Sequence, residues 1–256
     1  MTASETNRKL TSVLKRLRSA YGESPVPLLP PEGSVEPLVG EIVFSLLLWE
    51  SSLHQARAAY KRLHEQIADF NDLRVCFVGE IVPMLGDRYP LAVERSQRLK
   101  GVLQDIFRRQ NRLSLDAILQ APREDAAAFV ASLEGLPPFA AARVTRYRLE
   151  LPAIPVDHRL FTLLVDAGVL ADGEVSDALF RHASAVLEKQ LKESDADEAC
   201  RLFQAWSDGE GSTPRRERKA LSQEGETAPR KPKKAAPDSV KPQLTRKPAK
   251  KKSGSP

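Results

Sequence analysis

The chain has 256 residues, of which 41% are hydrophobic, 29% charged and 6% aromatic, and its formal net charge is +5. This length and apolar content suffice for one large or two small packed domains without a disulfide scaffold. Cys76 and Cys200 are too few for a disulfide framework or a four-thiolate metal site, and the four histidines have no metal-ligand spacing. The composition favours a reducing, intracellular setting and predicts no metal site.

The start of the chain and its longest apolar run argue against secretion and membrane insertion. Residues 1–17 (MTASETNRKLTSVLKRL) contain no apolar signal-peptide core, and the run 42–49 (IVFSLLLW) is too short to cross a bilayer. We therefore expect a cytoplasmic protein with no membrane partner, which would be nucleoid-associated in a bacterium or nuclear in a eukaryote.

The net positive charge of the chain comes from its C-terminal end. Residues 212–256 hold 14 Lys/Arg and 4 Asp/Glu, a net charge of +10, whereas residues 1–211 have a net charge of −5. This tail contains seven prolines and almost no large apolar residue, so it is predicted to be disordered. Such a segment can bind DNA or RNA by counterion release, although lysine-rich tails also serve solubility or bind other acidic partners. The tail lysines selected as DNA contacts are Lys231, Lys233, Lys234, Lys250, Lys251 and Lys252.

Apolar periodicity predicts an all-helical body. An amphipathic helix over 7–21 is followed by a proline-rich connector over 22–37. Residues 38–53 are apolar nearly all round, with Glu41 and Glu50 as the only charges, which predicts a central helix packed on several sides. Further helices are predicted over 54–68, 72–85, 90–110, 114–120, 123–133, 138–149, 158–168, 175–191 and 195–207, and no segment has a convincing strand pattern.

Helix ends and core faces can be assigned for several of these helices. The predicted N-caps are Asp72, Ser114 and Ser176, and the predicted left-handed C-terminal residues are Gly86, Gly135 and Gly168. The expected core faces of the last two helices are Ala178, Leu179, His182 and Val186, and Ala199, Leu202, Phe203 and Trp206.

Two neighbouring segments show a family pattern. Residues 133–144 read LEGLPPFAAARV, and residues 154–161 read IPVDHRLF. In order and spacing they resemble the hairpin L-x-x-L-P-G-V-G-x-K-T-A and the later P-V-D-T-H-V-x-R-V of the endonuclease III (HhH-GPD) superfamily of base-excision DNA glycosylases. The likeness covers roughly residues 5–207. Within this range, Glu36-Pro37-Leu38 looks like the start of the family's second helix.

This resemblance implies an all-α, two-lobed fold. The implied divisions are residues 1–35, a helix and connector that pack with the C-terminal helices, and 36–150, a six-helix-type lobe that ends in the hairpin. They continue with residues 151–211, the aspartate loop and C-terminal lobe, and 212–256, the disordered tail.

Several departures from the family pattern affect the chemistry. The hairpin glycines, whose N–H groups hold a DNA phosphate in the family, are replaced by Pro138 and Ala140, so phosphate binding should be weaker. The lysine that serves bifunctional members as nucleophile is replaced by Ala142, which predicts no AP-lyase activity. The cysteines of the family's iron–sulfur cluster are absent, so no cofactor is expected.

The resemblance makes Asp157 the candidate catalytic residue. A carboxylate there can stabilise the oxocarbenium character of the sugar and orient a water molecule while the N-glycosidic bond breaks. The alternative is that Asp157 caps the helix that begins near residue 158, and the two roles can coexist.

Further DNA contacts are predicted around the hairpin and after the second helix. The hairpin candidates are Pro137, Phe139, Ala140, Arg143 and Arg146, although a solvated basic face explains the arginines equally well. Residues 48–52 match the segment whose glutamine enters the duplex in the family, which makes Trp49 a candidate stacking wedge. A tryptophan at that spacing is more often a core residue.

Three functions follow from these observations. The first is a monofunctional DNA N-glycosylase of base-excision repair that uses Asp157. The second is a catalytically inactive protein of the same fold that binds double-stranded DNA through its tail, and the third is a protein–protein adaptor. The lesion, the oligomeric state and any protein partner are not identified by the sequence.

Overall fold

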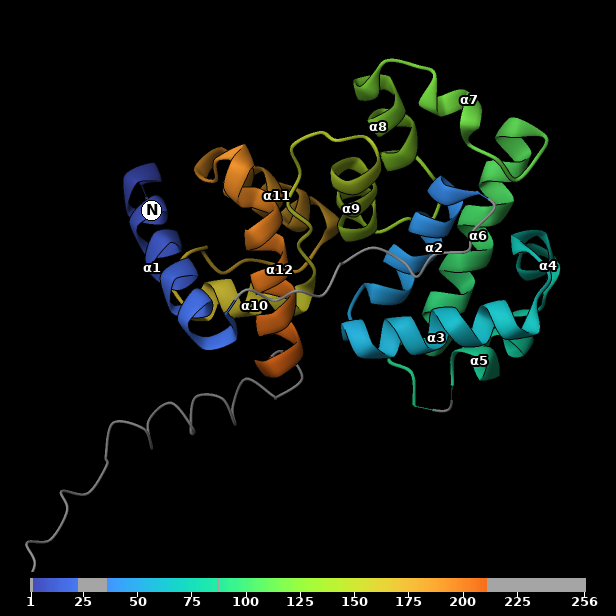
Figure 1. Cartoon of the computed structure of the whole chain (residues 1–256), viewed down its shortest axis with the longest axis horizontal. Coiled ribbons are helices and arrows are strands. Elements are labelled where there is room, and N and C mark those ends of the chain that lie inside the picture. The colour runs from blue at the N-terminus through green and yellow to red at the C-terminus, as the bar shows by residue number, and fades with distance from the viewer. Residues whose placement is uncertain (1, 23–35, 87, 211–256) are drawn as a thin grey trace, which may run out of the picture. The chain divides into compact units, whose positions relative to one another are not determined.

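The structure is a computed structural model that describes residues 2–22, 36–86 and 88–210 (Figure 1). Over these ranges it contains helices and no strand, which confirms the all-α class. Residues 23–35 of the predicted connector, and the tail with its six selected lysines, lie outside the described residues. The helices are α1 (Ala3–Tyr21), α2 (Pro37–Leu48), α3 (Leu53–Gln66), α4 (Phe70–Val75), α5 (Val78–Leu85), α6 (Ala92–Gln110), α7 (Asp116–Leu119), α8 (Arg123–Ala131), α9 (Pro138–Arg148), α10 (His158–Asp166), α11 (Asp177–Gln190) and α12 (Glu193–Glu210).

The described residues pack around two hydrophobic cores. The first is built by side chains from residues 38–144 and the second by α1 together with residues 154–206. In Figure 1, α1, α10, α11 and α12 group on one side and α2 to α6 on the other, with α9 between them. Helix α9 packs against both α2 and α11, so it joins the two groups of helices.

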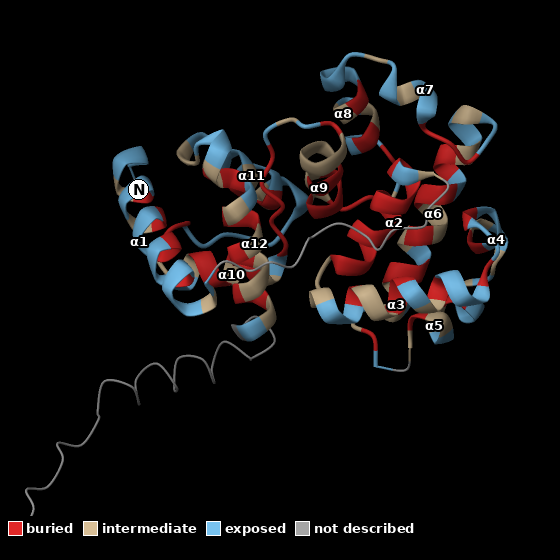
Figure 2. Cartoon of the chain, in the orientation of Figure 1, coloured by how far each residue is buried: buried red, intermediate tan, exposed pale blue. Residues whose placement is uncertain are grey.

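Helix α2 is the centre of the first core. All of its residues from 38 to 48 are buried, as the nearly continuous red ribbon of Figure 2 shows. The prediction of a helix packed on several sides is therefore confirmed. The helix was predicted to end at residue 53 but ends at Leu48, because residues 49–52 form a turn before α3 begins.

Three of the six predicted helix ends are confirmed. Gly86 and Gly168 follow α5 and α10 with positive φ angles of 107° and 70°. Gly135 also has a positive φ angle, of 82°, but α8 already ends at Ala131 with Ser132 as its C-cap. Ser176 caps α11 through its side chain. The N-cap of α4 is Asp69 instead of Asp72, because Asp69 Oδ1 accepts the N–H groups at positions 71 and 72. Likewise Leu115, and not Ser114, is the N-cap of α7.

One of the two predicted core faces was wrong in part, since Leu179 and Val186 of α11 pack against the second core but Ala178 and His182 are exposed. The face of α12 (Ala199, Leu202, Phe203 and Trp206) is buried as expected. Helix α11 instead buries Phe180, Ala183 and Leu187. The helix is rotated because the Phe180 ring packs edge-to-face on Phe161 of α10, with centroids 5.9 Å apart.

No helix within the described ranges is both long and apolar enough to span a bilayer.

Candidate functional site

Asp157 lies at the start of α10 and is only 4% exposed. It is the N-cap of that helix, since Oδ1 accepts the N–H of Leu160 at 2.9 Å. Its other oxygen, Oδ2, accepts the N–H of Glu50 at 3.2 Å. Both carboxylate oxygens are therefore held by main-chain donors, one from α10 and one from the turn between α2 and α3, and the orientation of the side chain is fixed.

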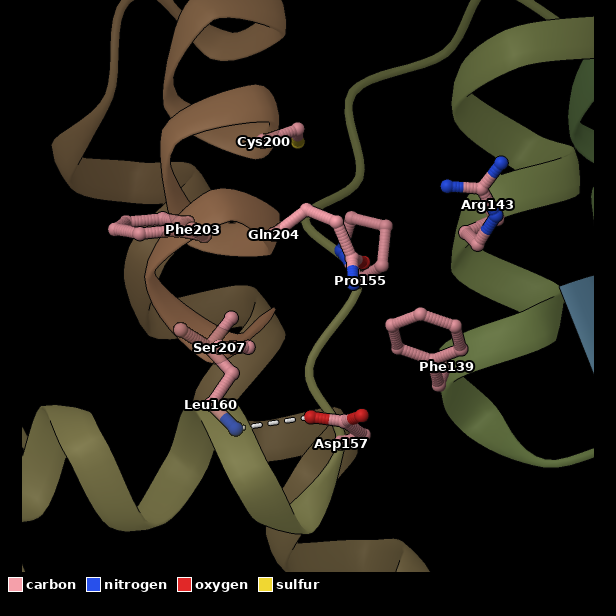
Figure 3. Close-up of a pocket in the computed structure, with 9 residues that line it drawn as sticks. All are labelled: Phe139, Arg143, Pro155, Asp157, Leu160, Cys200, Phe203, Gln204 and Ser207. Carbon is pink, nitrogen blue, oxygen red and sulfur yellow. Dashed lines mark hydrogen bonds between the residues drawn. The ribbon is translucent and has the colours of Figure 1, made fainter. Parts of the chain in front are cut away.

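Asp157 lines a small cavity between α9 and α12 (Figure 3). In that view Phe139 and Arg143 lie on α9, and Pro155 lies between α9 and α12. From α12, Cys200 and Gln204 point toward α9, whereas the Phe203 ring points away from it. The lining residues are Phe139, Arg143, Pro155, Asp157, Leu160, Cys200, Phe203, Gln204 and Ser207. The cavity volume is about 20 Å³, which is room for one water molecule and not for a nucleobase.

Glu50 is the residue of this site that sequence reasoning missed. It lies on the α2–α3 turn with φ +52°, a left-handed conformation that L-residues rarely adopt. Its Oε1 accepts the N–H of His158, the first residue of α10, at 2.7 Å. Burial, and next the negative charge of Asp157, raise the pKa of Glu50 to about 8.

Arginine side chains surround this pair of carboxyl groups. Arg159 donates hydrogen bonds to the main-chain oxygens of Ser51 and Ser207, so it ties the α2–α3 turn to α12. Arg159 and Arg95 both favour the charged form of Glu50 and thereby oppose the effects that raise its pKa. The turn is thus bound to α10 and α12 through the residue that follows Glu50.

Replacing Glu50 with glutamine should stabilise the protein increasingly as the pH rises. In the folded state Glu50 keeps its proton up to about pH 8, whereas in the unfolded chain it ionises near its ordinary pKa of 4.5. The folded state therefore binds more protons than the unfolded chain between these values, and stability falls as the pH increases. Glutamine does not titrate, so the stability of the Glu50→Gln variant relative to the parent protein should increase steadily between about pH 5 and pH 8.

Thermal unfolding measured between about pH 5 and pH 9 checks this expectation. Glu150→Gln is the matched control, because Glu150 has the same left-handed backbone (φ +53°) but its side chain is 73% exposed. A Glu50→Gln effect that stays constant over this pH range would contradict the assignment.

Arg143 does not occupy the position predicted for it. Its side chain is 1% exposed and forms an ion pair with the fully buried Glu41, with Nη2 and Oε1 3.1 Å apart. It also donates from Nε to Ser45 Oγ at 3.1 Å. The prediction of a phosphate contact by Arg143 is corrected, since its guanidinium joins α9 to α2 inside the protein.

The other hairpin candidates are also less accessible than predicted. Pro137, Phe139 and Ala140 are buried. The side chain of Arg146 is 9% exposed, and its Nε lies 2.9 Å from Asp197 Oδ1. Helix α9 has no side-chain N-cap, so main-chain N–H groups, and not these side chains, are what the hairpin can offer to a ligand.

Trp49 is half-buried at the C-terminal end of α2. Its ring is covered by two guanidinium groups, those of Arg98 and Arg95, at 4.8 and 5.6 Å from the ring centroid. Trp49 also packs against the first core. These contacts match the core alternative more closely than a freely projecting wedge.

Among the described residues, no group of three or more His, Cys, Asp or Glu side chains could hold a metal ion. The residue at the position of the family's lysine, Ala142, is half-buried on α9.

No protein-family profile matches the sequence, and no curated protein matches it. An endonuclease III in a non-covalent complex with DNA is similar, with a TM-score of 0.57 and 14% identity over 87% of this chain and 99% of that chain. A thermostable thymine-DNA glycosylase gives a TM-score of 0.52 and 16% identity over 82% and 90% of the two chains. The 3-methyladenine DNA glycosylase of H. pylori gives a TM-score of 0.52 and 11% identity over 80% of this chain and 99% of that chain. The chain therefore has the helical fold of the endonuclease III-like, helix-hairpin-helix DNA glycosylases.

Proposed function

We propose that this protein binds duplex DNA and hydrolyses an N-glycosidic bond as a monofunctional DNA glycosylase. The observation that supports this best is the placement of Asp157. Its carboxylate is oriented by two main-chain N–H groups and faces a cavity between α9 and α12. Solved proteins of this fold include a complex of endonuclease III with DNA, and that likeness supports DNA as the partner.

The hairpin supplies a phosphate contact despite its missing glycines. Pro138 is the first residue of α9 and has no N–H, but the next two residues, Phe139 and Ala140, still present theirs at the helix N-terminus. With no side chain capping α9, these donors and the helix dipole can hold a phosphate oxygen. The buried side chains around them position the helix end.

At the reacting sugar, Asp157 would act as a charge stabiliser and as a partner for water. Positive charge develops on the sugar as the base departs, and a fixed carboxylate lowers the energy of that state. Because Ala142 and its neighbours offer no amine nucleophile, water is the acceptor and the strand is left intact at an abasic site. A cavity of about 20 Å³ has to open before a base can enter, so the α9 and α12 faces must separate on binding.

A second candidate function is DNA binding without base excision. The same cavity favours it, since its volume of about 20 Å³ admits no base in the structure described here. In that case Asp157 serves α10 as a cap only.

Single-turnover assays of the full chain separate the two candidates. The duplexes carry uracil, an alkylated purine, an oxidised purine or an oxidised pyrimidine, and each reaction is split between alkali treatment and no treatment. We expect strand scission on one lesion class that requires alkali. Binding without scission on every duplex would favour the second candidate, and scission without alkali would contradict the monofunctional assignment.

A further inference from the structure

We propose that Glu50 is a positioning residue for Asp157, which holds the first turn of α10 from the opposite core so that the Asp157 carboxylate keeps facing the α9–α12 cavity. This inference rests on the proposed function for its catalytic part. Its structural part can be tested without any activity.

The contact between the two residues is reciprocal. The N–H of Glu50 donates to Asp157 Oδ2 at 3.2 Å, and the Oε1 of Glu50 accepts the N–H of His158 at 2.7 Å. The first turn of α10 therefore has two side-chain caps, because Asp157 itself takes the N–H of Leu160. The second cap comes from a residue more than a hundred positions earlier in the chain.

The backbone of Glu50 adopts a left-handed conformation while it makes this contact. A left-handed conformation is unfavourable for a residue other than glycine, so the surrounding structure must maintain it at Glu50. Main-chain atoms of the residues that follow Glu50 are fixed to the second group of helices. The oxygen of Ser51 accepts from Arg159, and the N–H of Leu53 donates to Asp208 Oδ2 at 3.0 Å. The turn is thus held rigidly enough to orient Asp157.

Glu50 touches the aspartate but does not line the cavity, which separates positioning from direct catalysis. A shift of the α10 first turn by about 1 Å is enough to reduce a reaction rate by as much as a hundredfold. The side chain of Glu50 should therefore affect the chemical step while leaving DNA affinity unchanged.

The test compares Glu50→Ala, Glu50→Gln and the matched control Glu150→Ala in the full chain. Glutamine retains an oxygen acceptor for His158, whereas alanine removes it. Glu150 shares the left-handed backbone but is paired with Arg123 at the surface. The first readout is amide hydrogen exchange at His158 and Leu160. We expect exchange at His158 to be about tenfold faster in Glu50→Ala only, with the other two variants like the parent protein.

The second readout is the single-turnover excision rate together with the Kd for the same duplex. Glu50→Ala should lower the rate on the order of tenfold at an unchanged Kd, and Glu50→Gln should restore it. Unchanged amide exchange in Glu50→Ala, or an equal loss of rate in Glu50→Gln, overturns the positioning role. If the parent protein excises no base, the proposed function fails, and the exchange data still decide whether Glu50 holds α10.

Discussion

Replacing Arg143 with methionine should lower the free energy of unfolding by about 3–5 kcal/mol. The substitution removes the guanidinium that pairs with Glu41 and leaves that carboxyl group buried without its main partner. Arg148 remains, but its Nε is 3.6 Å from Glu41 Oε2 and makes no hydrogen bond with it. Burial already raises the pKa of Glu41, so the variant should recover part of its stability as the pH falls and Glu41 gains a proton.

Arg146→Met is the matched control for this experiment. Arg146 lies on the same helix, but its partner Asp197 is largely exposed, so the free energy of unfolding should fall by less than about 1 kcal/mol. The double variant Glu41→Leu/Arg143→Met should regain most of the stability, because an apolar pair has no charge to desolvate. Urea unfolding measures all three variants. If Arg143→Met loses little stability but binds duplex DNA more weakly and with less salt dependence, Arg143 is a phosphate contact after all.

The burial of Arg143 could have been suspected from the sequence, but its partner could not have been identified. Glu41 lies within an otherwise apolar helix, which indicates a buried acid that needs a cation. Arg143 lies among small apolar residues of α9, which is compatible with a buried face. The two residues are 102 positions apart, and only the packing of α9 on α2 shows that they meet.

The fold was more predictable than the site because helical periodicity is a local property. The spacing of apolar residues and the glycines at 86, 135 and 168 locate most helices to within a few residues. The rotation of α11 could not be read in the same way, since apolar residues occupy two adjacent stripes of that helix. Contact with Phe161 on another helix selects the stripe that contains Phe180.

The role of Glu50 depends on a feature that no local pattern indicates. Its left-handed φ angle is unfavourable for glutamate, so residue propensity predicts a different turn. Asp157 was identified in advance because its own helix needs a cap and because the surrounding residues resemble a family. Glu50 caps a helix to which it is not connected, and such a contact becomes visible only when the two cores are placed together.

Replacing Asp157 with asparagine should reduce base excision by at least about a hundredfold while the protein remains folded. The amide oxygen of asparagine can still accept the N–H of Leu160, so the cap of α10 is kept. The amide nitrogen would then face the N–H of Glu50, and this donor–donor contact should cost about 1 kcal/mol of stability. The expected result is therefore a large loss of rate, caused by the lost negative charge, with a small loss of stability.

Asp208→Asn is the variant that separates these two effects. Asp208 accepts the N–H of Leu53 from the same α2–α3 turn, and asparagine keeps an oxygen acceptor there, so the turn that orients Asp157 stays held. Asp208 does not line the cavity with Asp157. It should lose a comparable amount of stability, about 1 kcal/mol, and keep its excision rate within about threefold of the parent rate. Single-turnover rates and urea unfolding of both variants check this. Equal rates in the two variants would show that Asp157 acts as a helix cap alone, because its charge would then contribute nothing to the reaction.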